Sequence, residues 1–172
     1  MSKGAPTRSP VTLVAAPVIL VVAIVAALQG SEKRVYTTYW DDLGKVYTAC
    51  AGVTGPGVIH GKTYTDAQCD AMESAYVSRM LRNMGQCVRR ELPFDVAKAF
   101  GHFAYNVGTA NFCASTGAKL LNAGDFKGAC KQILRWTFIK GKDCRDPRNK
   151  CGGIPKRREW EYQTCMQGAG NV

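Results

Sequence analysis

An uncharged apolar run near the N-terminus constrains this chain more than any other feature. Residues 11–28 carry no charged side chain, and eighteen residues lie near the lower length limit for a helix that spans a bilayer. Five alanines and Pro17 dilute the larger apolar side chains, so the run prefers the bilayer only weakly. Lys3 and Arg8 precede it, and positive charge of this kind stays in the cytoplasm. We therefore expect residues 1–30 to be a transmembrane segment that sends residues 31–172 outward.

Two fates of this segment are compatible with the sequence. In a cleavable signal peptide, the small residues at 25–27 would form the cleavage site. In an uncleaved signal anchor, the helix would hold the rest of the chain on the outer face of the inner membrane. Cleavage after Ala27 would leave only four residues ahead of Glu32, and for that reason we favour the anchor.

Eight cysteines follow the apolar run. They occupy positions 50, 69, 87, 113, 130, 144, 151 and 165. Their even number and the lack of any Cys-x2-Cys pair favour disulfides over a zinc site. Disulfides persist in an oxidising compartment, which agrees with export. The sequence leaves the pairing open, because eight cysteines allow about 105 connectivities.

The charge balance narrows the choice of partner. The net charge is +10, and residues 31–172 carry +8 of it. A basic domain suits polyanions in general, including nucleic acid, anionic lipid and cell wall. The basic residues are scattered, and no zinc-finger spacing or aromatic RNA-binding signature accompanies them, so we expect no nucleic-acid partner.

Local patterns predict an α+β fold with a small β lobe followed by a larger helical lobe. Residues 44–65 are rich in Gly, Val, Tyr and Thr and predict two or three short strands. Thr65 and Gln68 have the form of a capping box, which predicts a helix from there to about Gly85. Pro93 predicts the start of another helix, and a glycine C-cap at Gly108 predicts its end. Further helices are expected at roughly residues 115–122, 125–137 and 155–166.

The segment directly after the apolar run contains the side chains that glycoside hydrolysis requires. One carboxylic acid protonates the leaving oxygen, and a second carboxylate activates or positions water on the opposite face. Glu32, with Asp41 or Asp42 and with Thr48 as an extra water ligand, has this inventory.

These residues also stand in a family pattern. The spacing Glu-x8-Asp from Glu32 to Asp41, with Tyr39 before the Asp and Gly44 after it, continues into Thr48 and resembles the active-site segment of the phage-type lysozymes, glycoside hydrolase family 24. Further motifs keep the family's order over nearly all of residues 31–166. They lie at residues 103–108, 111–112, 115–116, 121–125, 135–136 and 153–159.

The resemblance implies an endolysin that hydrolyses the β-1,4 bond between N-acetylmuramic acid and N-acetylglucosamine in peptidoglycan and so lyses the host cell. It implies a lysozyme-like fold with a cleft between the lobes. Glu32 would protonate the glycosidic oxygen, and Asp41 and Thr48 would hold the water or stabilise positive charge on the sugar. The reaction requires no cofactor and no metal. The expected partners are peptidoglycan glycan strands, the inner membrane through residues 11–28 and the host secretion machinery, and the chain is expected to be a monomer.

One branch of the family fits the N-terminal run. In signal-arrest-release endolysins, a weakly hydrophobic helix enters the membrane first and later leaves it. The chain is therefore expected at the host inner membrane facing the periplasm and then free in the periplasm. Four extended residues after Leu28 span at most about 14 Å, so a tethered Glu32 would be held at the membrane surface. We expect the tethered form to be inactive.

The sequence departs from the family pattern at two positions. Six residues separate Asp41 from Thr48 where the family usually has five, so Asp42 is an alternative second carboxylate. The flanking Tyr39 and the intact Glu-x8-Asp interval favour Asp41. Lys33 replaces the glycine that commonly follows the acid.

Two rival functions remain open. A lytic transglycosylase would use one catalytic Glu and leave an anhydro sugar, whereas the presence of Asp41 and Thr48 favours hydrolysis. A membrane-anchored wall-binding module without catalysis would not need Glu32.

The remaining polar and aromatic residues are expected to be structural. His60 is expected in a loop, His102 on the surface or core edge of a helix, and residues 156–158 on a solvated face. Trp136 and Trp160 are expected to pack the helical lobe. Three residues that match family motifs are expected to line or support the cleft: Asn106, Thr116 and Arg135.

Overall fold

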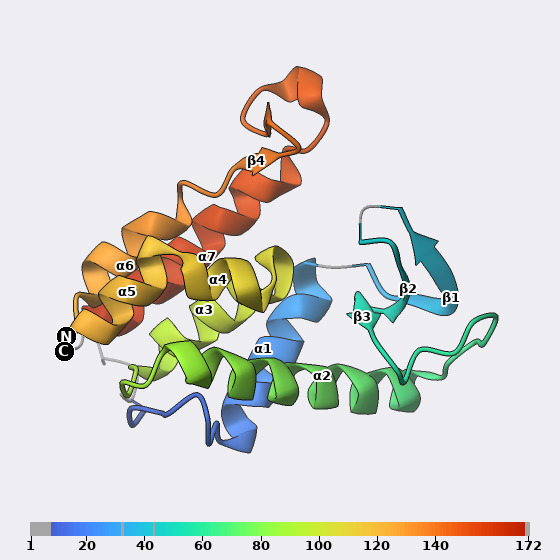
Figure 1. The fold of residues 1–172 in the computed structure, drawn as a ribbon, viewed down its shortest axis with the longest axis horizontal. Helices are drawn as coiled ribbons and strands as arrows, with labels where there is room; N and C mark the ends of the chain where they lie inside the picture. Colours follow the sequence, from blue (N-terminus) through green and yellow to red (C-terminus); the bar gives the residue numbers. More distant parts are fainter. Residues whose placement is uncertain (1–7, 32, 43, 171–172) are drawn as a thin grey trace, which may run out of the picture.

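The computed structural model describes residues 8–31, 33–42 and 44–170, and in these the chain forms a small sheet lobe and a larger helical lobe (Figure 1). The α+β architecture expected from the sequence is confirmed. The elements of the sheet lobe and its neighbouring helices are α1 (Val18–Ser31), β1 (Val35–Asp41), β2 (Val46–Cys50), β3 (Val53–Thr54) and α2 (Asp66–Cys87). The remaining elements are α3 (Phe94–Val107), α4 (Thr109–Ala114), α5 (Thr116–Ala123), α6 (Phe126–Ile133), β4 (Phe138–Ile139), β5 (Lys142–Asp143), a 3-10 turn (Pro147–Asn149) and α7 (Gly153–Ala169).

The sheet lobe is an antiparallel sheet in the order β1-β2-β3. Tyr39 lies opposite Thr48 and Asp41 opposite Val46 in the β1–β2 register. The strands expected within residues 44–65 are confirmed as β2 and β3. Strand β1 was not predicted, although its tyrosine, tryptophan and threonine residues are typical of strands.

The predicted start of α2 is confirmed. The Thr65 hydroxyl accepts a hydrogen bond from the Gln68 backbone N–H at 3.3 Å, and the Gln68 side chain accepts one from the Thr65 N–H at 2.9 Å. This reciprocal pair satisfies two of the donors that a helix N-terminus leaves unpaired. From this cap α2 runs for 22 residues to Cys87, so its first turns carry the sheet and its last turns belong to the helical lobe.

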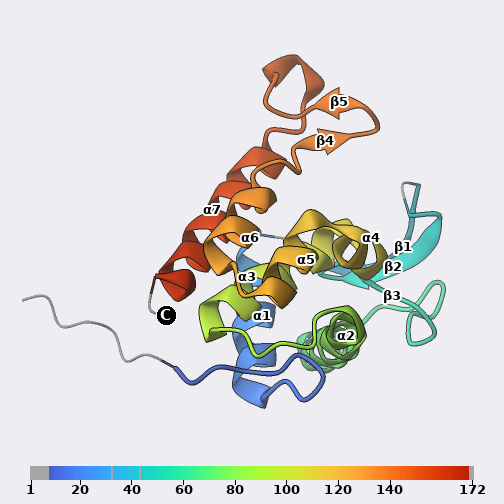
Figure 2. The same cartoon turned by 60° about the vertical axis from the view of Figure 1, so that its left-hand side comes forward.

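The helices α3 to α7 form the rest of the helical lobe. Pro93 precedes α3 and Gly108, at φ +86°, ends it, as predicted. The expected helices at 115–122 and 155–166 correspond to α5 and α7, but the helix expected at 125–137 ends at Ile133. A short hairpin, β4 and β5, follows it and projects from the helical lobe at the top of Figure 2. The short helix α4 was not predicted.

The apolar run at residues 11–28 is not one continuous helix. Pro17, whose fixed φ suits a helix start, divides it, and α1 begins at the next residue. Ahead of this point Val11 is extended and exchanges two backbone hydrogen bonds with Leu92, at 2.8 and 2.9 Å. Among the described residues, none of the helices combines the length and the apolar character needed to cross a membrane.

Instead, α1 packs against α2 and α3 and contributes to the main hydrophobic core. Ile24 and Leu28 are buried there. Two glycines allow the close approach: a Cβ at Gly101 of α3 would lie 2.4 Å from Ile24 Cδ1, and a Cβ at Gly85 of α2 would lie 2.7 Å from Val14 N. Since protein interiors are close-packed, either methyl group would force the N-terminal segment outward.

All eight cysteines are paired, which confirms the expected disulfides. The pairs are Cys50–Cys69, Cys87–Cys113, Cys130–Cys165 and Cys144–Cys151. The first joins β2 to the first turn of α2, and the third joins α6 to α7.

Candidate active site

A cleft of about 600 Å³ separates the sheet from the helical lobe. Its wall includes side chains from β1 and β2 on one side and from α3 and α7 on the other. The polar residues of this lining are Tyr39, Asp41, Thr48, Thr54, Tyr105, Asn106, Asn111 and Arg158.

Two of the three predicted site residues lie in this wall. Asp41 is the last residue of β1, and Thr48 of β2 is almost fully buried, at 3% exposure. A Cβ at Gly44 would lie 2.9 Å from Asp41 Oδ2, so the glycine leaves room for the carboxylate in the turn that follows β1. The alternative carboxylate, Asp42, has an 87% exposed side chain and pairs with Lys45 at 3.8 Å.

The third predicted residue, Glu32, lies outside the described residues. The chain on either side of it is held in place. Ser31 ends α1, and Arg34 forms ion pairs with three carboxylates of α2. These partners are Asp66 at 3.0 Å, Asp70 at 2.7 Å and Glu73 at 2.7 Å.

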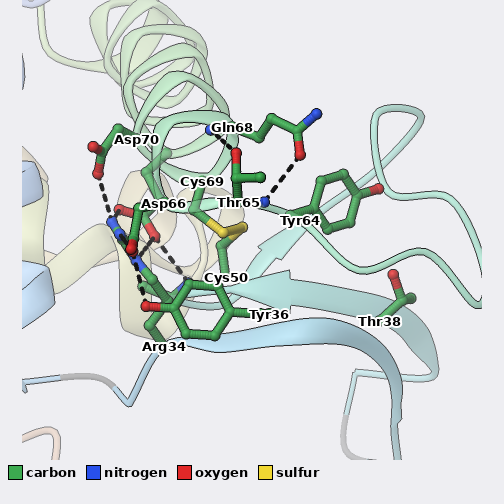
Figure 3. Close-up of a disulfide and its surroundings, with 12 residues drawn as sticks. Arg34, Tyr36, Thr38, Cys50, Tyr64, Thr65, Asp66, Gln68, Cys69 and Asp70 are labelled. Atoms are coloured by element: carbon green, nitrogen blue, oxygen red, sulfur yellow. Dashed lines mark hydrogen bonds and ion pairs between the residues drawn. A yellow bond between two sulfur atoms is a disulfide. The ribbon is translucent and has the colours of Figure 1, made fainter.

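The Arg34 cluster lies beside the Cys50–Cys69 disulfide, and Figure 3 shows Arg34 pointing toward Asp66 and Asp70. Hydrogen bonds to Glu73 hold the pKa of the Arg34 guanidinium above its usual range, so this residue stays charged. Glu73 is itself 1% exposed and accepts a hydrogen bond from the Ala51 N–H at 3.1 Å. A buried carboxylate that pairs with a cation and a backbone donor is satisfied, and this one fixes the entry to β1 on α2.

The helical side of the cleft is ordered by hydrogen bonds to the turn after β2. Tyr105 of α3 donates from its hydroxyl to the Ala51 carbonyl at 2.8 Å. Glu73 and Tyr105 therefore hold both backbone groups of Ala51, which sets the sheet at a fixed distance from α3.

Arg158 departs from the sequence expectation. It was predicted on a solvated face with its two basic neighbours, but it is 1% exposed and lines the cleft. Its Nη2 donates to Asn106 Oδ1 at 2.9 Å, and its Nε lies 2.8 Å from Glu161 Oε2. Glu161 stands one turn further along α7, and this i,i+3 partner is the signal that could have indicated an inward arginine.

His102 also departs from its expected place on a helix surface or core edge. It is 1% exposed and bonds to Glu161 through Nδ1 at 2.7 Å. Of the three residues expected to line or support the cleft, Asn106 lies in the wall, whereas Thr116 and Arg135 are exposed and are not among the lining residues.

No metal centre is indicated within the described part of the chain. The group there with three ligand types in range is Cys50, Cys69 and Glu73, and its two sulfur atoms are consumed by a disulfide.

A small sheet and a helical lobe on either side of a polar cleft define a lysozyme-like α+β protein. Solved structures share this fold. The muramidase domain of SpmX from Asticaccaulis excentricus matches with a TM-score of 0.71 at 18% identity, over 84% of this chain and 95% of that one. The active form of the P1 phage endolysin Lyz matches with a TM-score of 0.68 at 20% identity, over 98% of both chains.

Sequence comparison is more specific. The phage lysozyme family model matches residues 29–161. The SAR-endolysin of Enterobacteria phage PA-2 is 37% identical over 139 residues, which are 81% of this chain and 79% of that protein. The SAR-endolysin of Escherichia phage Mu is 35% identical over 130 residues, or 76% of this chain and 71% of that protein. The chain therefore belongs to the phage lysozyme family, and it is a glycoside hydrolase that degrades peptidoglycan.

Proposed function

We propose that this endolysin hydrolyses the β-1,4 bond between N-acetylmuramic acid and N-acetylglucosamine, with Glu32 as general acid. The observation that carries the proposal is the cleft wall, in which Asp41 and Thr48 of the sheet face Asn106 and Arg158 of the helical lobe. A polysaccharide strand needs an open groove with two carboxyl groups near its scissile bond. The described residues supply the groove and one of these groups, Asp41, and the proposal assigns the other to Glu32.

In this mechanism Glu32 gives a proton to the glycosidic oxygen. Asp41, with Thr48 beside it, holds the attacking water or stabilises positive charge on the sugar. The cleft geometry supports Asp41 over Asp42 as the second carboxylate, because only Asp41 lines the groove. Adjacent residues at a strand end point to opposite sides, so one of the pair faces solvent when the other faces the cleft.

The N-terminal helix supports a membrane stage before the folded enzyme. In the folded state α1 exposes three large apolar side chains: Val18 is 78% exposed, Ile19 54% and Val22 56%. A surface helix normally turns polar residues to water, whereas a helix that is apolar on all sides suits lipid. The curated relatives are named SAR-endolysins. We infer that α1 first resides in the inner membrane and that the enzyme is later released into the periplasm.

Release would complete the enzyme. Ile24 and Leu28 of α1 belong to the core of the helical lobe, so a chain with α1 in the bilayer lacks part of that core. The tethered form is inactive in this proposal, and Glu32 reaches the cleft once α1 docks. Passage through the host secretion machinery and action as a monomer remain predictions.

Turbidity of outer-membrane-permeabilised Gram-negative cells tests the chemistry. The whole chain is used, because α1 contributes to the core. We expect clearing by the wild type and a loss of at least about 100-fold in Glu32→Gln, since the acid is removed while the shape is kept. Asp41→Asn should lose most activity, and Asp42→Asn should retain it.

The products separate the enzymatic alternatives. A hydrolase leaves reducing N-acetylmuramic acid ends, whereas anhydro ends would identify a lytic transglycosylase. Full clearing by Glu32→Gln would overturn the assignment of the acid. Retained wall binding without any clearing by the wild type would leave only the wall-binding module.

A charge on α1 tests the membrane stage separately. Val22 is exposed in the folded enzyme, so Val22→Lys should leave the activity of the purified protein within about twofold of wild type, as surface substitutions usually do. The same lysine near the centre of a membrane helix costs about 3 kcal/mol, so export in living cells should fall. Val22→Leu is the matched control. Equal export of the lysine and leucine variants would contradict membrane insertion by this helix.

A further inference from the structure

A chain of polar side chains, buried in its middle, runs from the end of α1 to the cleft. His102 of α3 is 1% exposed and Glu161 of α7 is 0% exposed, and His102 Nδ1 lies 2.7 Å from Glu161 Oε1. On its other side, His102 Nε2 lies 2.9 Å from the hydroxyl of Ser31. Three helices therefore meet at one imidazole ring.

The chain of contacts continues past Glu161. Its carboxylate is held by Arg158, with Nε at 2.8 Å from Oε2 and Nη2 at 3.1 Å from Oε1. Arg158 also donates to Asn106, and these last two side chains line the cleft. We call the set Ser31, His102, Glu161, Arg158 and Asn106 the polar relay. Its three middle members are buried, and its two ends, Ser31 and Asn106, are exposed.

Burying the polar side chains of His102, Glu161 and Arg158 costs free energy unless each is paired. A core leucine in place of His102 would satisfy packing alone, so packing does not explain why an imidazole stands here. Its two nitrogens are the feature that a leucine lacks, and they connect Glu161 to Ser31. In the sequence Ser31 directly precedes Glu32.

We propose that His102 is a positioning residue for the general acid. By holding the Ser31 hydroxyl, it fixes the direction in which the chain leaves α1 toward Glu32, and through Glu161 it ties that direction to Arg158 in the cleft wall. The inference rests on the proposed role of Glu32.

The Ser31 hydroxyl can donate its single proton in one of two directions, so the hydrogen bonds of the relay have two arrangements. The hydroxyl carries one proton, and the Leu28 carbonyl lies 3.2 Å away as a second acceptor. When His102 is neutral and donates from Nδ1 to Glu161, Ser31 must donate to Nε2. When His102 is doubly protonated, Nε2 donates to Ser31, and the hydroxyl proton turns to Leu28.

The charged surroundings of the ring come from each helix that meets it. On α7 the charged groups are Glu161 and Arg158, together with Lys156 and Arg157, which line one pocket with His102 and Ser31. The uncharged ring of Trp160 lies 4.7 Å from the imidazole. On α3, Lys98 lies over the face of Trp160, at 5.5 Å. On α1 the facing group is the neutral hydroxyl of Ser31. His102 therefore contacts the neutral hydroxyl of Ser31 on one side and the Glu161–Arg158 pair on the other.

Steady-state kinetics on purified dye-labelled peptidoglycan with the whole chain test this proposal. Ser31→Ala removes the hydroxyl but leaves His102 and Glu161 paired in the core. A small misplacement of the proposed acid, Glu32, slows the chemical step more than it weakens substrate binding. We therefore expect kcat to fall about tenfold while KM stays within about twofold. Ser78→Ala, the same change on α2 outside the relay, should leave both constants at wild-type values.

Two substitutions at position 102 separate positioning from folding. His102→Leu should lower kcat at least as far as Ser31→Ala. His102→Gln supplies one donor for Glu161 and one acceptor for Ser31, so kcat should recover to within about threefold of wild type.

The outcomes distinguish the two proposals. A wild-type kcat in Ser31→Ala, with Glu32→Gln inactive, would overturn the positioning role alone. Recovery of stability but not of kcat in His102→Gln would also overturn it. Full activity in Glu32→Gln would overturn the assignment of the acid itself, whatever the variants at positions 31 and 102 show.

Discussion

The N-terminal helix and the small sheet both pack on α2, but different forces hold them there. The sheet is linked to α2 by the Cys50–Cys69 disulfide and by the ion pairs of Arg34. The helix α1 has no disulfide, because residues 1–49 contain no cysteine. It is held chiefly by buried apolar side chains, with a close approach to Gly101, and the segment ahead of it approaches Gly85. The sheet stays linked to α2 once the disulfide has formed. The packing of α1 can form or break without making or breaking a covalent bond.

This difference suits the proposed order of events. A sheet that is crosslinked to α2 can fold in the periplasm while α1 is still in the bilayer. An apolar helix can then exchange lipid contacts for protein contacts at little cost in burial, since both environments are dry. Gln29 adds a polar contact, with its amide donating to Glu73 at 3.0 Å. The substitutions below act on one attachment or the other.

The largest effect is expected from the buried face of α1. Ile24 is fully buried, so Ile24→Ala should lower the free energy of unfolding by about 4 kcal/mol through lost burial and the cavity it leaves. Ile19→Ala, on the same helix but at 54% exposure, should cost less than about 0.5 kcal/mol. Urea unfolding of the whole chain measures both. Equal losses would mean that α1 does not dock through this face in solution.

The next effect concerns the covalent attachment of the sheet. The Cys50–Cys69 bridge closes a loop of 19 residues, so replacing both cysteines by alanine should cost about 3 kcal/mol in the chain-entropy model. Replacing Cys144 and Cys151, which are 7 residues apart, should cost about 2 kcal/mol. Thermal unfolding at matched pH compares the two variants. An unchanged melting temperature in the first would show that the ion pairs alone hold the sheet.

A smaller effect is expected where α1 meets α3. Gly101→Ala places a methyl group against Ile24 Cδ1, and overpacking of this kind should cost about 2 kcal/mol. Ile24→Val removes that methyl, so the double variant should be more stable than the sum of the single changes predicts by about 1 kcal/mol. Gly30→Ala is the control, because a Cβ there would have nothing within 4 Å. If the free-energy changes of the two substitutions simply added, the close approach of Ile24 to Gly101 would be contradicted.

The sequence predicted local boundaries well because their causes are local. The capping box at Thr65, the helix start at Pro93 and the glycine C-cap at Gly108 each depend on a few neighbouring residues. The docking of α1 depends instead on Gly101, and that of the segment ahead of it on Gly85; both glycines are distant in the sequence. An uncharged apolar helix satisfies a bilayer and a protein core equally well, so composition alone could not show that this one docks.

In the cleft too, local sequence predicted some features, and others depend on contacts between distant residues. The spacing from Glu32 selected Asp41 and Thr48 as candidates, but the choice between Asp41 and Asp42 depends on the phase of β1, which the sequence analysis did not predict. The inward arginine at position 158 was missed because Lys156 and Arg157 beside it imply a solvated face. Only the packing of α7 on α3 brings Arg158 to Asn106.

The smallest effect is a pH dependence of the sheet attachment. Hydrogen bonds from Tyr36 and then Arg34 hold the pKa of Asp66 below its ordinary value of 3.8. A carboxylate whose pKa is lowered by folding stabilises the folded state above its ordinary pKa, and this contribution is lost as pH falls through the lowered value. Asp66→Asn should therefore be less stable than wild type near neutral pH. The difference in their free energies of unfolding should disappear below pH 3.8, as wild type loses the Asp66 contribution. The Tyr36 hydroxyl bonds to Asp66 at 2.8 Å and is the main cause of the shift. Tyr36→Phe should therefore be less stable than wild type at neutral pH, by most of the loss seen in Asp66→Asn. Urea midpoints of wild type, Asp66→Asn and Tyr36→Phe, measured against pH, test this prediction. A difference between wild type and Asp66→Asn that stays constant across the acid range would show that Asp66 stabilises α2 without its bond to Tyr36.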